Sequence, residues 1–389
     1  MKPFTSRDNV AERLAPQLPS KIPSLDGLRA VSIGFVLFSH AFGTRNFPVH
    51  SFPAVGAMGS FGVRVFFIIS GFLITTLLLK ERARTGRISI KAFYTRRFLR
   101  IFPAFYTYVG ACAILLALGW RTVLAGDLLH ALTYTVNYHH PHGWLFAHIW
   151  SLSVEEQFYL LWPAVIAFAG PLWAARAAMA AILVVPVFRL ATLQFFPMPA
   201  AYFGQQFHLT ADALATGCLL AAAHNWLGSQ PRYLDFLRGR FFVLVPIFGL
   251  LLNGLSEKPR IMGLAGSSLM NLAIVLTMDR MVRFPNGFAG RLLNTEPVRF
   301  VGVLSYSLYL WQQLFLDRSS SGPMQAFPVN VLGVFAAALL SYCFVEKPFL
   351  RLKDRFSKEH STGDSTPDLP ADSCETVLQG AGSAKAGRK

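Results

Sequence analysis

The sequence predicts an all-α protein that crosses a membrane about ten times, with both termini in the cytoplasm. Hydrophobic residues make up 53% of the 389 positions and charged residues only 14%. Apolar stretches long enough to cross a bilayer recur from about residue 28 to about residue 345, with no soluble-looking block between them. We therefore expect one membrane domain over residues 22–352, between a cytoplasmic segment 1–21 and a disordered cytoplasmic tail 353–389.

The first five spans follow from the requirement for about 20 mostly apolar residues per helix. This requirement places them near residues 28–45, 61–79, 101–119, 149–169 and 174–193. The polar N-terminal segment before them has neither the short apolar core nor the cleavage site of a secretory signal. We expect the first span to act as its own insertion signal.

The same requirement predicts five further spans in the second half of the chain. They lie near residues 207–223, 241–256, 261–279, 300–317 and 327–345. After Phe356 the chain is rich in Ser, Thr, Gly, Ala and Asp and poor in apolar residues. A segment of this composition cannot bury enough apolar surface to fold, which is why we expect disorder there.

The positions of the basic residues give the orientation. With the N-terminus inside, 29 of the 36 Lys and Arg residues fall in cytoplasmic segments and only five in outer loops. Such an asymmetry is typical of cytoplasmic loops and supports an even number of spans. It also accounts for the net charge of +16 without a nucleic-acid partner. We expect a multi-pass protein of the bacterial inner (cytoplasmic) membrane, in contact with membrane lipid.

Two loops differ sharply in composition. Residues 80–100 carry eight basic residues, and the aromatic and basic segment 93–100 is expected to lie along the inner membrane surface. The outer loop 120–148 is poor in charge and holds five histidines, at 130, 139, 140, 142 and 148. Their spacing does not match a known metal site, so we predict no metal.

Ionisable residues inside spans are costly in lipid and are candidates for function. They are Arg29, His40, Arg64, Glu155, Glu156, Arg189, Asp212 and Asp279. Arg189, Asp212 and Asp279 lie near helix ends, where snorkelling or a partner charge would explain them.

Arg29 and His40 share one face of the first span. Eleven residues at about 100° each bring the helix to within about 20° of three full turns, with a rise of about 16 Å. One helix would then hold a phosphate-binding cation at the inner mouth of a channel and an acid–base group farther up. A hydrogen-bonded helix contact is the alternative role for His40.

Glu155 opens the fourth span, which runs from outside to inside, so we expect it at the depth of His40. There its carboxylate would hold the imidazole in the tautomer that a general base needs, or accept a hydrogen bond from a sugar hydroxyl. The alternative is a helix-start role, because carboxylates are favoured in a first turn by the helix dipole.

Six motifs resemble those of acyltransferase family 3, membrane-bound O-acyltransferases that modify surface polysaccharides and related acceptors. They are residues 24–30 (SLDGLRA) leading to His40, 62–74 (GVRVFFIISGFLI), 93–97 (FYTRR) with 100–103 (RIFP), 150–155 (WSLSVE), 305–311 (SYSLYLW) and 346–349 (EKPF). The resemblance covers about residues 22–352.

The resemblance implies a ten-helix enzyme that moves an acyl group, commonly acetyl from acetyl-CoA on the cytoplasmic side, to a hydroxyl of a glycan or similar acceptor. The family's motifs fall on Arg29, His40, Arg96, Arg97 and Glu155. Many members have His where this chain has Gln312, so a proton-handling role there is in doubt. Some relatives carry an extra hydrolase-like domain, and we expect transfer here to finish within the membrane domain.

We therefore expect His40 to act as general base and Glu155 to stabilise its charged form, with no permanently bound cofactor. A covalent acyl-His intermediate remains an alternative. The predicted sites are the phosphate-binding residues Arg29, Arg96, Arg97 and Arg100, and the substrate-binding residues Arg64, Ser70, Trp150, Tyr159 and Tyr309. Each arginine near the headgroups has the alternative role of a topology determinant.

Two other functions fit the same features. A proton-coupled secondary transporter also needs buried charges, although no matched pair of broken helices occurs in the two halves. An enzyme that acylates a small molecule, such as a macrolide, would also need the same catalytic groups. The sequence does not identify the acceptor.

Overall fold

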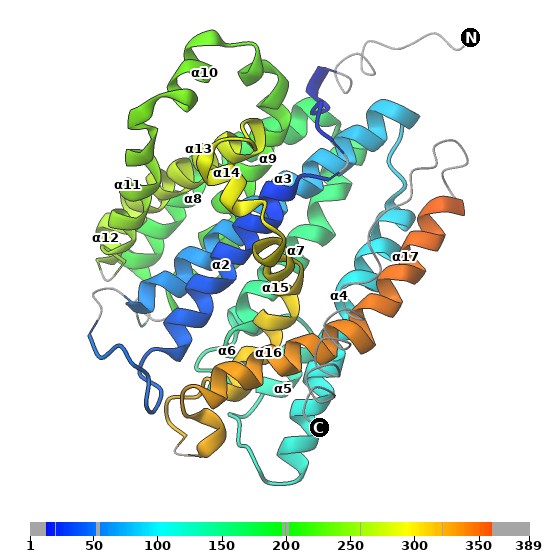
Figure 1. Ribbon diagram of the computed structural model, residues 1–389. Coiled ribbons are helices and arrows are strands. Elements are labelled where there is room, and N and C mark those ends of the chain that lie inside the picture. Colours follow the sequence, from blue (N-terminus) through cyan, green and yellow to red (C-terminus); the bar gives the residue numbers. More distant parts are fainter. Residues whose placement is uncertain are drawn as a thin grey trace, which may run out of the picture.

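The computed structural model describes residues 13–19, 21–51, 55–196, 199, 202–256, 258–320 and 322–359. All regular structure within these ranges is helical, and they contain no β-strand. Figure 1 shows the longer helices running roughly side by side in one bundle. The predicted all-α class is therefore confirmed.

In the first half of the chain, helices coincide with each of the five predicted spans. The elements are α2 (Pro23–Ala41), α3 (Val55–Thr85), α4 (Ile90–Ala117), α5 (Asp127–Leu132), η1 (Val136–Tyr138), α6 (Trp144–Ala147), α7 (Ile149–Ala164), η2 (Val165–Ala169) and α8 (Pro171–Phe195). A proline starts α2 and α8, where its fixed φ and missing N–H are tolerated.

In the second half, the remaining five predicted spans also coincide with helices. The elements are α9 (Phe207–Gly228), α10 (Pro231–Arg238), η4 (Arg240–Val243), α11 (Leu244–Asn253), α12 (Pro259–Ile261), η5 (Met262–Gly266), α13 (Ser267–Arg283), α14 (Phe288–Leu293), α15 (Glu296–Phe315), η6 (Pro323–Gln325), α16 (Val329–Ser341), η7 (Tyr342–Glu346) and α17 (Lys347–Glu359). Single π-turns join α12 to α13 and α16 to α17 into two longer helices.

The lengths and surfaces of the helices are those of a multi-pass membrane protein. Within the described ranges, five helical stretches are both long and apolar enough to cross a membrane: Val55–Thr85, Ile90–Ala117, Pro171–Phe195, Pro259–Arg283 and Val329–Phe356. Large apolar side chains such as Phe168 and Phe288 are more than four-fifths exposed. So much apolar surface suits lipid and not water.

Two details differ from the sequence prediction. Residues 93–100, expected along the membrane surface, continue into the span as part of α4, because Ser89 caps the helix ahead of them and the helix runs on without a break to Ala117. Helix α17 extends to Glu359, past the predicted start of disorder at residue 353. The rest of the predicted tail, 360–389, lies outside the described residues.

The centre of the bundle is built by α2, α3, α9 and α15, which pack on one another. Small residues allow this close approach. A side chain at Gly71 would collide with the Leu214 carbonyl of α9, and one at Gly217 with the Ile68 carbonyl of α3. The faces of α2, α3 and α15 that remain open to one another line the candidate site.

Candidate functional site

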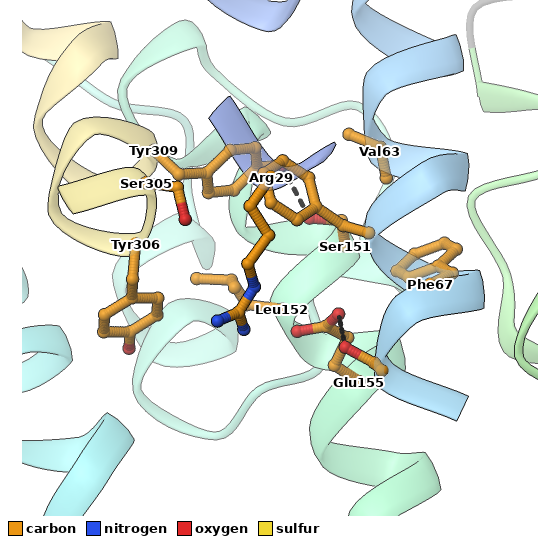
Figure 2. A pocket seen from close by; sticks show the side chains of 11 residues that line it. Arg29, Val63, Phe67, Ser151, Leu152, Glu155, Ser305, Tyr306 and Tyr309 are labelled. Atoms are coloured by element: carbon orange, nitrogen blue, oxygen red, sulfur yellow. Dashed lines mark hydrogen bonds between the residues drawn. The ribbon is translucent and has the colours of Figure 1, made fainter. Parts of the chain in front are cut away.

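An inner cavity of about 60 Å³ lies between α2, α3, α7 and α15. Figure 2 shows the Arg29 side chain pointing into it, toward Leu152 and Glu155, with Tyr306 and Tyr309 on the other wall. Ser70 and Ser151 add hydroxyl groups to the lining. The cavity is narrow, so it suits an extended chain better than a bulky headgroup.

Glu155 is held by hydroxyl groups inside this cavity. Ser70 Oγ donates to Glu155 Oε1 at 2.7 Å, and the Tyr159 hydroxyl donates to Ser70 Oγ at 3.1 Å. Arg29 and Arg97 both attract the carboxylate electrostatically. Predicted catalytic and substrate-binding residues thus meet here, but around Arg29 and not around His40.

Basic side chains of α2 and α4 lie close to Glu155. The Arg97 guanidinium lies 5.6 Å from the Phe93 ring centre and 5.5 Å from that of Tyr159. Arg100 is close enough to repel both Arg29 and Arg97. Nearby carboxylates, Glu155 among them, offset part of this repulsion, and a bound anion would offset more of it.

Arg96 differs from its neighbour Arg97. Its Nη2 lies 3.1 Å from Glu81 Oε2 at the end of α3, and the side chain is 35% exposed. Its charge is therefore already partly neutralised by a carboxylate. The two arginines of the 93–97 motif, predicted as equal phosphate ligands, are in different environments.

An outer cavity of about 180 Å³ contains His40. His40 Nδ1 lies 2.9 Å from Gln312 Oε1, and the imidazole packs edge-on against Trp144 with ring centres 5.4 Å apart. With the amide oxygen as acceptor, Nδ1 carries the proton and Nε2 keeps its lone pair. Nε2 has no hydrogen-bond partner in the described part of the chain, so it is available as a base.

His148 lines the same cavity but is fully engaged. Its Nδ1 lies 2.8 Å from Gln313 Oε1 and its Nε2 lies 3.1 Å from the Leu310 carbonyl. Both nitrogens face oxygen acceptors of α15 and the side chain is 3% exposed, so His148 is held by α15 and is not presented to a substrate. It anchors the start of α7 to α15.

The predicted pairing of His40 with Glu155 is wrong in this structure. Each hydrogen-bonds a different partner, and they line different cavities. The cause is the segment before α7. Because Leu145, Phe146 and Ile149 are buried, the chain is already inside the bundle when α7 begins, and Glu155 lies deeper along α7 than the level of His40. The two cavities are nevertheless neighbours, because Val63 and Tyr309 line both.

Tyr309 and Trp150, both predicted to bind substrate, lie where cavities join. The Tyr309 hydroxyl donates to the His148 carbonyl at 2.8 Å and lies 2.6 Å from Ser151 Oγ. Trp150 packs edge-on against Phe67 and lines both the outer cavity and a third one. Both residues therefore shape a wall, and Tyr309 contributes little free hydrogen-bonding capacity.

The third cavity is the largest of the three, at about 760 Å³. It shares residues of α3 with the outer cavity and is bordered by Arg64 and Arg189. Arg189 forms an ion pair with Asp212, with Nη2 and Oδ1 2.5 Å apart and both side chains buried. A partner charge thus explains two of the buried ions. Asp279 is likewise paired, with Arg283 at 2.7 Å.

The outer-loop histidines form contacts among themselves. His130 stacks on His139 at 4.2 Å, and His139 Nε2 lies 3.1 Å from Asp127 Oδ1. Burial, and then the neighbouring His142, lower the pKa of His140, which keeps that ring neutral. No group of three or more candidate ligands for a metal ion occurs among the described residues.

Sequence reasoning missed the two glutamines that hold the histidines. Gln312 contacts His40 and Gln313 contacts His148 from successive positions of α15. The only signal was their place after Trp311, where many relatives have His. Asn271, which joins Arg64 to Asp212, gave no signal at all.

Comparisons with known proteins find relatives that are named as O-acetyltransferases. Among relatives, "Putative peptidoglycan O-acetyltransferase YrhL" of Bacillus subtilis is 28% identical over 84% of this chain and 54% of its own length. Peptidoglycan O-acetyltransferase OatA of Listeria monocytogenes is 27% identical over 84% of this chain and 55% of its own. The chain thus spans about half the length of these relatives.

No solved structure matches the chain. A family model described as "Acyltransferase domain" matches residues 22–346, which include every motif residue of the inner and outer cavities. The chain therefore belongs to acyltransferase family 3.

Proposed function

We propose that this protein is a ten-span O-acyltransferase that moves an acetyl group from acetyl-CoA to a hydroxyl group of a glycan. One observation carries the proposal: the inner cavity, beside the arginines, and the outer cavity, with His40, lie side by side and share the lining residues Val63 and Tyr309. A donor chain and an acceptor that enter from opposite sides would meet there. The names of the relatives support acetyl and glycan as the substrates.

The donor would bind from the cytoplasmic side. Arg97 and Arg100, with Arg29, supply positive charge for the phosphates of CoA, and guanidinium groups bind phosphate with two parallel hydrogen bonds. The inner cavity then takes the thin pantetheine arm, with Ser70 and Glu155 as hydrogen-bonding groups along it. Arg96 contributes less to phosphate binding, because its charge is already paired with Glu81.

The transfer step needs one base. His40 Nε2 takes the proton of the acceptor hydroxyl while its oxygen attacks the thioester carbonyl carbon. The new C–O bond forms, the C–S bond breaks, and the leaving thiolate takes the proton back from the imidazolium. The products are the acetyl ester and the CoA thiol. Gln312 keeps the Nδ1 proton in place throughout.

The orientation of the chain supports this direction. The end of α3 and α10, in basic segments of the chain, lie at one end of the bundle in Figure 1, and α5 and α6 lie at the other. By the asymmetry of Lys and Arg, the first end is cytoplasmic. The arginines would then face the pool of acetyl-CoA, and the His40 cavity would face outward.

The test is thiol release from acetyl-CoA by the purified protein with a glycan acceptor. His40→Ala should lower the rate by about 10² to 10⁴ while leaving the protein folded, because a general base contributes about that much. His50→Ala, at an exposed position on the same side of the bundle, is the matched control and should keep the full rate. Normal transfer by His40→Ala would exclude the mechanism, and no release by wild type would favour a transporter.

A further inference from the structure

The side chains beside the third cavity form a chain of hydrogen bonds inside the membrane domain. Arg64 Nη1 donates to Asn271 Oδ1 at 2.9 Å, and Asn271 Nδ2 donates to Asp212 Oδ2 at 2.9 Å. Arg189 closes the chain, with Nη2 on Asp212 Oδ1 and Nε on the Leu209 carbonyl at 2.7 Å. Four helices, α3, α8, α9 and α13, contribute to it.

This chain of contacts carries one unbalanced positive charge. Two guanidinium groups face a single carboxylate, and both oxygens of Asp212 are already used. Arg189 is 2% exposed, and its Nη1 has no hydrogen-bond partner among the described residues. A buried charge without a counter-charge is costly, and an anion bound nearby would remove that cost.

The cavity beside the charge has room for a ligand and the right lining for an anion. Of the described side chains that line it, the ionisable ones are Arg64 and Arg189, accompanied by hydroxyl and amide groups. Arg64 reaches its second partner, Ser267, at 3.5 Å, a long contact that a better acceptor would replace.

The third cavity also borders the outer cavity. Gly56, Ser60 and Val63, on one face of α3, line both, and Arg64 lies one turn beyond Ser60 on that face. Trp150 and Gln205 border both from other elements. A ligand in the third cavity can therefore extend into the space around His40.

We propose that the third cavity is an acceptor subsite for an oxyanion, a sugar carboxylate or phosphate, held by Arg64 with Arg189 behind it. The inference rests on the proposed function and narrows it, because the acceptor is then an anionic glycan whose hydroxyl reaches His40 while its acidic group sits on Arg64. A charge-assisted hydrogen bond to a buried group contributes about 1.5–3 kcal/mol, which corresponds to about a 10- to 100-fold preference over a neutral sugar.

The experiment measures binding of three sugars to the purified full chain in nanodiscs by saturation-transfer NMR. Glucuronate and glucose 1-phosphate are the anionic probes and glucose is the neutral one. Wild type should bind at least one anionic sugar about 10- to 100-fold more tightly than glucose. The tighter of the two anionic probes identifies the acceptor's acidic group as carboxylate or phosphate.

Three variants test whether Arg64 causes the preference for anionic sugars. Arg64→Gln should bind all three sugars alike, Arg64→Lys should keep part of the preference, and the control Arg260→Gln, exposed on the same side, should keep all of it. A wild-type protein without the preference, or an Arg64→Gln protein that retains it, overturns the subsite. An elution profile like that of wild type shows that each variant is folded.

Thiol release from acetyl-CoA, measured in parallel, separates the two proposals. Release without a preference for anionic sugars would overturn the anion subsite and leave the acyltransferase proposal standing. The preference without any release, with every acceptor tried, would overturn the proposed activity and leave an anion-binding cavity.

Discussion

Gln312 decides which nitrogen of His40 can act. Its side chain is fully buried, so water cannot replace the amide oxygen that accepts the Nδ1 proton. With that proton fixed, the lone pair is on Nε2, on the side of the outer cavity. A neutral amide orients the imidazole but does not neutralise its positive charge, which a carboxylate partner would do.

We expect Gln312→Met to lower kcat for transfer by about 10- to 100-fold, because the volume is kept but the buried Nδ1–H loses its acceptor. KM for acetyl-CoA should change little, since Gln312 does not line the inner cavity. Steady-state thiol release gives both constants. Gln312→Glu restores an acceptor and should recover much of the lost rate; if it does not, Gln312 is only a packing residue.

The neighbouring arginines of α4 offer an internal comparison. Arg97→Gln should raise the dissociation constant for CoA by about 10-fold or more, because its half-buried charge has no carboxylate hydrogen-bonded to it and lies beside Arg29 and Arg100. Arg96→Gln should raise it far less, since Glu81 already neutralises that charge. Calorimetric titration with CoA measures both. An unchanged constant in Arg97→Gln would return that residue to a role in topology, and an equally large rise in both variants would contradict the difference between the two arginines.

Helices α3 and α9 cross at two glycines, and the site depends on that crossing. Gly71 and Gly217 bring the two backbones into contact, which places Ser70 beside Glu155 and Arg64 within reach of Asn271. In lipid, close packing of small residues replaces the hydrophobic force that holds soluble helices together. A wider crossing would therefore separate the walls of two cavities at once.

We expect Gly217→Ala to destabilise the protein by about 1–3 kcal/mol, because the added methyl group meets the Ile68 carbonyl and the Phe72 amide. Gly110→Ala is the control: no atom lies within 4 Å of a methyl group there, and alanine is the better helix former. The thermal unfolding midpoint in detergent should fall for the first variant and stay level or rise for the second. A midpoint unchanged in Gly217→Ala would show that α3 and α9 can move apart freely.

The positions of the helices could be predicted from the sequence, but the helices that pack against one another could not. Hydropathy placed a helix at each of ten segments, since lipid requires the chain to satisfy its own hydrogen bonds. The phase of Arg29 and His40 on α2 correctly directed both into the site. The depth of α7 was not predictable, because α6 before it is apolar but has only four residues, too few for hydropathy to separate it from the span that follows. Contacts from α15 to α2, such as Gln312 to His40, depend on packing over 272 positions of sequence.

The three cavities form one system around α3. Val63 lines all of them, and its side chain is 7% exposed. The proposed donor arm, base and acceptor occupy one cavity each, so transfer requires that the space at this residue stay open. Val63 thus affects passage between the cavities through the size of its side chain alone, because it has no polar or charged group.

We expect Val63→Phe to reduce acetyl transfer by about 10²-fold or more, since a misplacement of reacting groups by about 1 Å costs that much. Binding of CoA should be largely kept, because the arginines that meet its phosphates lie on α2 and α4. Val65→Phe is the matched control: it is the same change two residues on, equally buried, but facing a separate apolar cavity of about 190 Å³. Loss of both activity and CoA binding in both variants would show that the substitutions disturb folding. Full transfer by Val63→Phe would show that the acyl group does not pass between these cavities at Val63.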